Sequence, residues 1–166
     1  WASILDDGRI DAVVVATPIK THAALANQAL DAGKHVFVEK PLAQTAVAAR
    51  ALVEKADSNS LTLMTGHTYL YSPTVRQVKK LIESGQLGRI VHVSSSRMNF
   101  GPLLEGMSVV WDLMPHDISI LRYLFSDRSP QRVRAAGVSH LRDGTTDTAH
   151  ALVYYEDGLT AELRAS

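Results

Sequence analysis

The sequence predicts an open α/β fold that is followed by a segment mixing helices with antiparallel strands. Residues 11–66 alternate between short apolar runs and Ala/Leu-rich segments, which is typical of parallel strands joined by right-handed helical crossovers. The C-terminal part ends in two alternating segments joined at residues 156–158, the pattern of a hairpin. We therefore expect one domain at residues 1–70 and a second at residues 71–166.

The first element is an unbroken apolar run at residues 11–16, closed by Thr17-Pro18. A run without alternation predicts a strand that is buried on both faces of a sheet. Such a strand needs a neighbour on each side, and few residues precede this one, so we expect the chain to be truncated at both ends. The next elements are a helix at 21–31, a strand at 35–39, a helix at 43–57 and a strand at 61–66.

The second half begins with a helix at 73–83, which has Pro73 in its first turn and Gly85 after its end. A long alternating strand is expected at 89–100, and a loop at 101–106. An apolar helix is expected at 110–125 in spite of Pro115. The remaining strands are expected at 132–141, 147–155 and 159–165.

Composition excludes several classes of protein. The chain has 166 residues, no cysteine, and 17 basic against 17 acidic side chains, so disulfide scaffolds and cysteine-based zinc sites are excluded. A zero net charge gives no electrostatic footprint for nucleic acid or an anionic membrane. The longest apolar runs are far shorter than the ~20 residues of a membrane span. Asp6 and Asp7 stand where a signal peptide would be basic, so a cytoplasmic location is expected.

Thr17-Pro18 is the first place where chemistry is suggested. In open α/β sheets, ligands bind beyond the carboxyl ends of the strands, which makes both residues candidates for a binding site. The alternative is that Thr17 caps a turn and Pro18 ends the strand. The local pattern leaves both interpretations open.

Glu39-Lys40-Pro41 occupies the same position after the next strand. A lysine there can neutralise a phosphate, or it can hydrogen-bond a reacting hydroxyl and favour its ionised form. Pro41 fixes the direction of the chain directly afterwards. The alternative is an exposed ion pair between Glu39 and Lys40 ahead of a helix.

The third candidate is the segment WDLMPHD at residues 111–117. Asp112 and His116 are four residues apart, so on a helix they share one face. A carboxylate beside an imidazole orients the ring and favours its protonated form, as a general acid or base requires. Alternatively, Asp112 caps a helix, Pro115 lies in its first turn and Asp117 complements the helix dipole.

Other catalytic classes find no support in the sequence. The 166 residues contain no GxSxG, no Walker A and no GxGxxG motif. The seven histidines are scattered without HxH or HExxH spacing. Asp112, His116 and Asp117 lie too close on one helix to converge on an ion, so we expect no metal site.

Taken in order, the motifs resemble the glucose–fructose oxidoreductase/inositol dehydrogenase/MocA (Gfo/Idh/MocA) family. The matching segments span nearly the whole chain: DAVVVATP at 11–18, His22, AGKHVFVEKP at 32–41, TGHTYLYSP at 65–73, GQLGRI at 85–90 and WDLMPHDISIL at 111–121. Residues 98–124 are most similar to members that act on nucleotide-linked sugars, such as UDP-N-acetyl-hexosamine(uronate) 3-dehydrogenases.

The resemblance implies a two-domain enzyme that binds NAD or NADP. Residues 1–70 would be the second half of a Rossmann doubly wound parallel sheet, and residues 71–166 the first part of an α+β domain with a mostly antiparallel sheet. The family's glycine-rich first turn and its ribose-binding acidic residue have no counterpart here. They would lie upstream of Trp1, so the sequence does not choose between NAD and NADP.

The resemblance also implies roles for individual residues. Lys40 resembles the family lysine that contacts the nicotinamide side and the substrate hydroxyl, His116 the proton-transferring histidine, and Asp112 a carboxylate of the same pocket. The implied cofactor contacts are Thr17, Pro18, His22, Glu39, Lys40 and Trp111, and the implied substrate contacts are Tyr69, Arg97 and Asn99.

The implied function is hydride transfer between the nicotinamide cofactor and a carbinol of a sugar, nucleotide-sugar or cyclitol. His116 would remove the hydroxyl proton while Lys40 stabilises the developing alkoxide. The implied partners are the small-molecule substrate and further copies of the chain, in dimers or tetramers formed through the second-domain sheet. The alternative is a non-catalytic binding or assembly module, or an inactive fragment, of the same fold.

Overall fold

The computed structural model describes residues 1–98, 107–141 and 143–166, which form two compact units, Trp1–His67 and Thr68–Ser166. The first unit contains a three-stranded parallel sheet in the order β1-β2-β3. Its elements are α1 (Ala2–Leu5), β1 (Ala12–Val15), α2 (Ile19–Asp31), β2 (His35–Glu39), α3 (Ala46–Ser58) and β3 (Leu63–Gly66). The expected order of strands and crossover helices is confirmed.

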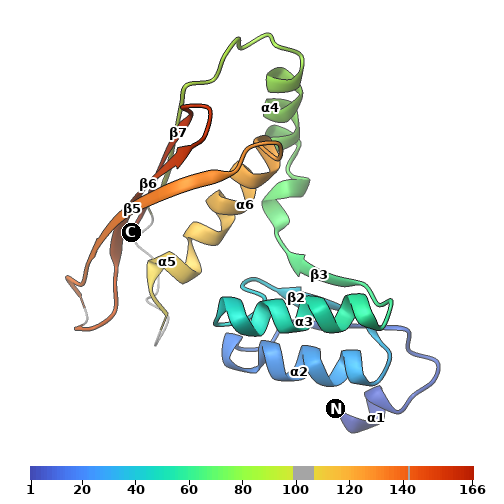
Figure 1. Ribbon diagram of the computed structural model, residues 1–166. Helices are drawn as coiled ribbons and strands as arrows, with labels where there is room; N and C mark the ends of the chain where they lie inside the picture. Colours follow the sequence, from blue (N-terminus) through green and yellow to red (C-terminus); the bar gives the residue numbers. More distant parts are fainter. Residues whose placement is uncertain (99–106, 142) are drawn as a thin grey trace. The chain divides into compact units, whose positions relative to one another are not determined.

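The apolar run of β1 is covered on one face only. Val13 and Val15 are buried against the helices, whereas Ala12 is exposed and Val14 is 70% exposed. Both α2 and α3 lie on the same side of the sheet (Figure 1), and successive strand residues point to opposite faces. The expectation of a strand buried on both faces is therefore wrong for this unit.

Local capping decides where the helices begin and end. The Thr45 side chain accepts a hydrogen bond from the backbone N–H of Ala48 at 3.2 Å, so α3 begins at Ala46 and not at Ala43. Helix α2 ends as expected, because Gly33 follows it with a φ of 72°, a conformation that glycine adopts without steric cost.

The second unit contains a four-stranded sheet in the order β4-β7-β6-β5. Its elements are η1 (Thr68–Tyr71), α4 (Pro73–Glu83), β4 (His92–Arg97), α5 (Val109–Asp112), α6 (Met114–Leu124), β5 (Pro130–Val138), β6 (Thr148–Tyr155) and β7 (Thr160–Ala165). The predicted hairpin of β6 and β7 is confirmed, and β5 pairs antiparallel with β6.

The expected mostly antiparallel sheet is confirmed, and its one parallel pair among the described strands joins β4 to β7. No tight turn joins these two strands, and the chain passes through helices and two other strands between them. Their relative direction is therefore not fixed by a hairpin. The sheet is mixed, with β4 as an edge strand that pairs only on one side among the described residues.

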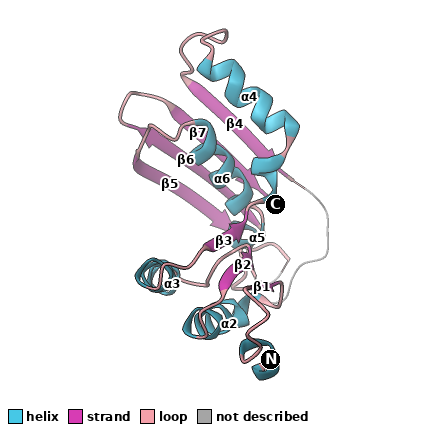
Figure 2. Ribbon diagram, turned by 90° about the vertical axis from the view of Figure 1, so that its right-hand side faces the viewer, coloured by secondary structure: helices cyan, strands magenta, loops and turns pink. Residues whose placement is uncertain are grey.

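Helices α4 and α6 pack on the same face of this sheet (Figure 2), where the core of the unit forms. Phe125 and Leu159 are each only 1% exposed in this core. Because side chains alternate along each strand, Ser95 and Arg97 of β4 point to the helical face, and Ser94 and Ser96 point to the other.

The expected helix at residues 110–125 is broken into α5 and α6 at Leu113. Pro115 has no N–H, and its ring would clash with the carbonyl of Trp111 in a continuous helix. The backbone N–H of His116 bonds to the carbonyl of Leu113 at 3.2 Å instead of that of Asp112. Asp112 and His116 therefore belong to two helices, which corrects the expectation of one shared helical face.

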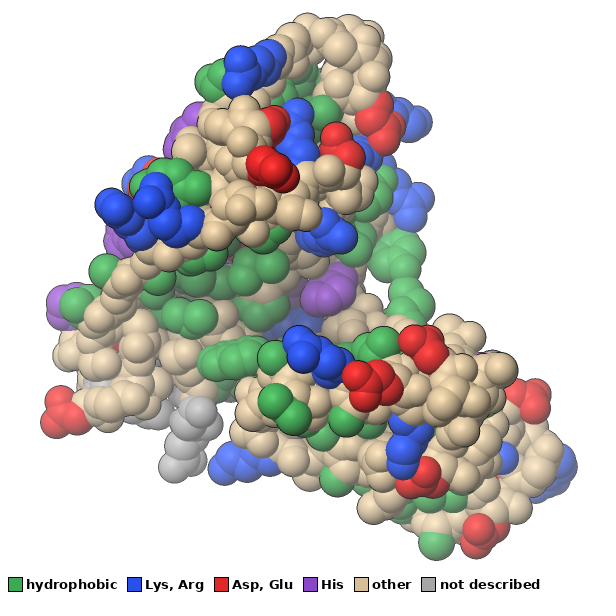
Figure 3. Space-filling model, in the orientation of Figure 1, with side chains coloured by type: hydrophobic (Ala, Val, Ile, Leu, Met, Phe, Trp, Pro, Cys, Tyr) green, Lys and Arg blue, Asp and Glu red, His purple; other side chains and the backbone are tan. Residues whose placement is uncertain are grey.

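On the face shown in Figure 3, acidic and basic side chains are interspersed over both units, consistent with the equal number of each in the sequence. Within residues 1–98, 107–141 and 143–166, every helix is too short or too polar to cross a lipid bilayer.

Candidate functional site

The carboxyl ends of the three parallel strands carry polar residues in the first unit. Thr17 follows β1, Lys40 follows β2 and His67 follows β3. Because the strands are parallel and adjacent, these positions lie along one edge of the sheet. This is the edge at which open α/β sheets bind their ligands.

Thr17 belongs to a chain of hydroxyl groups at the start of α2. The Oγ1 atoms of Thr17 and Thr21 are 2.6 Å apart, and Thr21 Oγ1 donates to the carbonyl of Pro18 at 2.7 Å. Since the single hydroxyl proton of Thr21 is used on Pro18, Thr17 is the donor to Thr21. Thr17 and Pro18 are both exposed, so this turn can still be approached from solvent.

His22 fastens the ends of β1 and β2 together. Its Nε2 lies 2.7 Å from the carbonyl oxygen of Thr17, and its Nδ1 lies 2.8 Å from that of Pro41. The side chain is 2% exposed, so it acts from inside the unit on the two segments that carry Thr17 and Lys40.

Glu39 supports the backbone on which Lys40 is mounted. Its Oε2 accepts the N–H of Lys40 at 3.2 Å, and a cis peptide bond joins Lys40 to Pro41. A Cβ on Gly66 would lie 3.1 Å from Glu39 Oε1 and 3.1 Å from Phe37 Cζ, so the glycine makes room for this carboxylate. Lys40 is partly buried at the end of β2.

His67 was not singled out from the sequence, although it occupies the position after β3 that corresponds to Lys40 after β2. Its Nδ1 is buried without a hydrogen-bond partner among the described residues. Burial lowers the pKa of His67 below its ordinary value of 6.5, and the nearby carboxylate of Glu39 partly opposes this effect. The signal that could have identified it is its place directly after a predicted strand.

The lowered pKa of His67 predicts a pH-dependent stability of the first unit. Protonation is disfavoured in the folded state, so the stabilisation is complete above 6.5 and is lost as the pH falls from there toward the folded-state pKa. We expect His67→Gln to reduce the loss of unfolding free energy between about pH 7.5 and about pH 5.5, by less than ~1 kcal/mol because the ring is only partly buried. Urea denaturation at both pH values measures this.

His140→Gln is the control for this experiment, because His140 is an exposed histidine of the other unit. An equal pH dependence in His67→Gln and the unmodified protein would contradict the assignment.

The second unit contains a cluster of polar side chains around Asp117, on the first turn of α6. Asp117 is 4% exposed and accepts three hydrogen bonds: from Ser95 Oγ at 2.8 Å, Arg97 Nε at 3.0 Å and Arg97 Nη2 at 3.1 Å. The two bonds from Arg97 form a bidentate ion pair. Hydrogen bonding to Asp117 raises the pKa of Arg97 above its ordinary value.

Arg97 also binds Tyr69, which in turn contacts His116. Arg97 Nη1 donates to Tyr69 Oη at 2.9 Å, and the guanidinium lies 4.4 Å from the centre of the Tyr69 ring. The ring of Tyr69 meets that of His116 edge-on, with centroids 4.9 Å apart. The structure therefore brings together three residues selected from the sequence, Tyr69, Arg97 and His116, and adds Asp117 and Ser95.

The other site residues predicted in the second unit, Trp111, Asp112 and Asn99, are not seen to join the cluster around Asp117. Trp111 lies on α5 and is 45% exposed, and Asp112 is the partly buried last residue of α5. Asn99 lies outside the described residues. The sequence suggests Asp117 as a helix-dipole residue and as a weak metal-ligand candidate, because nothing in it shows that β4 runs beside α6.

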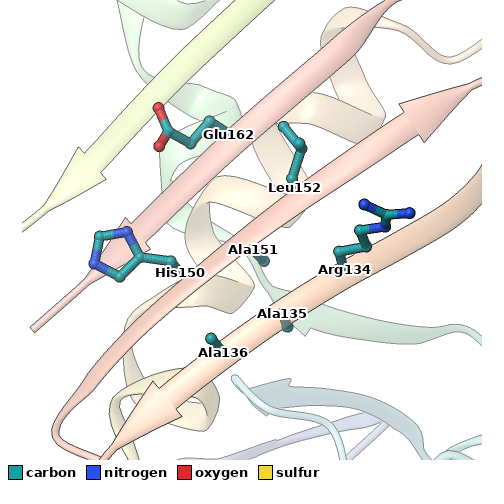
Figure 4. Close-up of a pocket in the computed structure, with 7 residues that line it drawn as sticks. All are labelled: Arg134, Ala135, Ala136, His150, Ala151, Leu152 and Glu162. Atoms are coloured by element: carbon teal, nitrogen blue, oxygen red, sulfur yellow. The ribbon is translucent and has the colours of Figure 1, made fainter.

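Two hollows of about 280 Å³ each lie on the sheet of the second unit. One is a shallow depression over β5, β6 and β7 (Figure 4), lined by Arg134, Ala135, Ala136, His150, Ala151, Leu152 and Glu162. The other is mostly apolar and lies between α6 and the sheet, with Ile118, Phe125 and Val133 among its lining residues. Neither is lined by His116, Tyr69 or Arg97, so the hollows do not define the candidate site.

Within the described residues, no group of three or more His, Cys, Asp or Glu side chains is arranged so that it could hold a metal ion. Each unit by itself carries candidate residues: a lysine and a histidine at strand ends in the first unit, and a histidine beside an aromatic ring and an ion pair in the second. Polar residues at the carboxyl edge of a parallel sheet are typical of ligand-binding α/β proteins, because open α/β sheets bind their ligands at this edge.

The chain belongs to the Gfo/Idh/MocA oxidoreductase family. Residues 1–67 match the family model described as "Oxidoreductase family, NAD-binding Rossmann fold", and residues 75–166 match the GFO/IDH/MocA C-terminal domain. The expectation of an α/β fold of this family is confirmed.

Curated relatives include dehydrogenases with different substrates. The chain is 33% identical over 158 residues to UDP-N-acetylglucosamine 3-dehydrogenase of Acidithiobacillus ferrooxidans, covering 95% of the chain and 49% of the relative. It is 32% identical over 142 residues to levoglucosan dehydrogenase of Pseudarthrobacter phenanthrenivorans, covering 78% of the chain and 36% of the relative. It is 30% identical over 167 residues to inositol 2-dehydrogenase 2 of Saccharopolyspora erythraea, covering 96% and 49%.

Solved structures agree with this assignment. An NAD-binding protein from Listeria innocua has a TM-score of 0.91 at 28% identity, covering 98% of this chain and 49% of that one. The apo scyllo-inositol dehydrogenase from Lactobacillus casei has a TM-score of 0.85 at 26% identity, covering 99% and 51%. The chain thus spans about half the length of these relatives or less.

Proposed function

We propose that the chain is part of an NAD(P)-dependent oxidoreductase that transfers a hydride between a nicotinamide cofactor and a carbinol of a sugar, nucleotide-sugar or cyclitol. The observation that carries this proposal is the position of Lys40 at the carboxyl edge of a parallel sheet, on a backbone held by Glu39 and His22. Family membership supports the reaction class, because the matching model describes oxidoreductases.

The carboxyl edge of the first unit fits one part of a dinucleotide. Thr17 and Pro18 are exposed there, and Lys40 provides a cation beside them on the neighbouring strand. We propose that these residues, with Glu39 and His22 supporting the backbone, hold the cofactor, and that Trp111 flanks it. When bound, the nicotinamide exchanges a hydride with the carbinol carbon of the substrate.

In this proposal Lys40 and His116 both act on the substrate hydroxyl group. His116 takes the hydroxyl proton on oxidation and returns it on reduction. Lys40 donates a charge-assisted hydrogen bond to the same oxygen as negative charge develops on it. Asp112 supplies a carboxylate near the histidine, and Tyr69 and Asn99 are the proposed substrate-side residues.

The function is tested by assaying the complete gene product for reduction of NAD⁺ and of NADP⁺ with a panel of myo-inositol, scyllo-inositol, levoglucosan and UDP-N-acetylglucosamine. We expect turnover with at least one carbinol and a preference for one cofactor. Tight cofactor binding without turnover on any sugar, nucleotide-sugar or cyclitol would instead favour a non-catalytic module of the same fold.

We further propose that the protein works in the cytoplasm as a homodimer or homotetramer assembled through the sheet of the second unit. The sheet face opposite to α4 and α6 supports this, since it presents the exposed side chains of Arg134 and His150 and the depression of Figure 4. Light scattering on the complete gene product should give the mass of two or four subunits, and Arg134→Glu should lower it. A monomer at all concentrations would contradict this.

A further inference from the structure

We propose that the buried ion pair of Asp117 and Arg97 is a positioning device for His116, acting through the ring of Tyr69. This inference rests on the proposed function, in which His116 moves a proton. It assigns Asp117 and Arg97 to the control of the histidine's orientation and charge, and this role replaces the substrate contact that the family resemblance implies for Arg97.

The first step is the fixed position of Asp117. Its carboxylate is almost fully buried and receives three hydrogen bonds from β4, two of them from the fork of Arg97. A buried carboxylate requires such a partner, because an unpaired charge in the interior is strongly destabilising. Asp117 thereby ties the first turn of α6 to β4.

The second step is the fixed position of Tyr69. The guanidinium of Arg97 both stacks on the Tyr69 ring and donates to its hydroxyl. With Nε and Nη2 committed to Asp117, and Nη1 to Tyr69, each nitrogen of Arg97 already donates within the unit. These contacts support a role for Arg97 in positioning the Tyr69 ring better than they support a role in binding substrate.

The third step is the contact with His116. It completes a chain of contacts from Asp117 through Arg97 and Tyr69 to His116, which we call the circuit. The Tyr69 ring packs edge-on against the imidazole, while the backbone carbonyl of His116 accepts the hydroxyl of Ser119 at 2.7 Å. His116 and Asp117 are sequence neighbours, so α6 supplies both ends of a circuit that passes through β4 and η1. A change at Asp117 or Arg97 therefore reaches the imidazole from both its backbone side and its ring side.

The circuit also has an electrostatic consequence. The positive charge of Arg97 is separated from the imidazole by one aromatic ring, and Asp117 neutralises it. Removing the carboxylate would leave a cation that disfavours the protonated imidazole, and removing the guanidinium would leave an anion that favours it. Besides His116 and Asp117, the charged or titratable groups on α6 and the elements around it are Tyr69 and Tyr71 of η1, Arg76, Lys79, Lys80 and Glu83 of α4, His92 and Arg97 of β4, Asp112 of α5, Arg122 and Tyr123 of α6, and Glu162 and Arg164 of β7. Of these, His92, Glu162 and Arg164 point to the opposite face of the sheet.

The test is an NMR titration of His116 in the complete gene product labelled at histidine, alongside the pH profile of kcat/KM. We expect Asp117→Asn to move the midpoint of the His116 titration to lower pH and Arg97→Gln to move it to higher pH, each by roughly one unit at an effective dielectric constant of about 20. The double variant should return close to the original midpoint. Ser95→Ala, which removes one neutral hydrogen bond to Asp117, is the control and should leave the midpoint unchanged.

Arg97→Lys tests the orientation of His116 separately from the charge near it. This variant also provides a test if Asp117→Asn does not fold. Lysine keeps the positive charge but cannot make the bidentate pair of hydrogen bonds to Asp117. We therefore expect kcat to fall, while KM for the carbinol and the midpoint of the His116 titration stay unchanged. A raised KM with unchanged kcat would show that Arg97 binds substrate and would overturn the proposal, as would midpoints that move in the same direction or not at all in the first two variants. Opposite midpoints combined with full turnover of His116→Ala would support the circuit and reject the proposed function of His116.

Discussion

His116→Ala is expected to lower kcat by roughly 10²–10⁴-fold, the range that a positioned general acid or base contributes. The imidazole lies on the first turns of α6, where the ring of Tyr69 contacts it and Ser119 binds its backbone carbonyl. Removing it takes away the group that we propose exchanges the hydroxyl proton, while the first unit, with its proposed cofactor residues, remains unchanged. Steady-state kinetics with the preferred carbinol measure the loss, and quenching of protein fluorescence by NADH or NADPH measures cofactor binding.

His140→Ala is the matched control, because His140 is an exposed histidine of the same unit, beyond the end of β5. It should leave kcat unchanged. Near-normal turnover of His116→Ala would remove this histidine from the mechanism, and a large loss of cofactor affinity would assign it to cofactor binding instead.

Lys40→Met is expected to lower kcat by about 10²–10³-fold, the usual effect of removing one donor that stabilises a developing oxyanion. Methionine keeps most of the side-chain length but has no charge and no N–H to donate. The backbone should stay in place, because Glu39 and His22 hold it through the N–H of Lys40 and the carbonyl of Pro41. The same kinetics should show the loss, with cofactor affinity largely retained.

Lys20→Met is the control for this variant, since Lys20 is an exposed lysine on α2 of the same unit. Lys40→Arg should not restore full activity, because a planar guanidinium donates with a different geometry from an ammonium group. If Lys40→Arg were fully active, a positive charge at any nearby position would suffice, and the proposed hydrogen bond to the reacting oxygen would be wrong.

Elements with strong local signals were predicted closely. The bounds of β2 and α4 agree with the expectation, because an apolar run of β-branched residues and a proline–glycine frame leave little choice of structure. The helix predicted over residues 110–125 is instead two helices that meet at Leu113. Pro115 ends one helix and starts the next, and the apolar pattern on both sides of it continues without a visible break.

The residues of the candidate site divide in the same way. Thr17, Lys40 and His116 were identified because they follow strands or belong to a family motif. The sequence did not predict the roles of Asp117 and His67, because these roles come from neighbours far along the chain. Asp117 binds Ser95 and Arg97 of β4, and His67 lies near Glu39.

The sequence by itself determined the alternation of strands and helices in the first unit, the hairpin of β6 and β7, and the family to which the motifs point. These depend on local periodicity, turn residues and short segments whose side chains act where they stand. Only the tertiary structure decided that β4 pairs parallel with β7, that one face of β1 stays uncovered, and that Asp117, Arg97, Tyr69 and His116 form one circuit. The physical reason is that burial and long-range hydrogen bonds depend on which elements pack together, and a local pattern of residues does not contain that information.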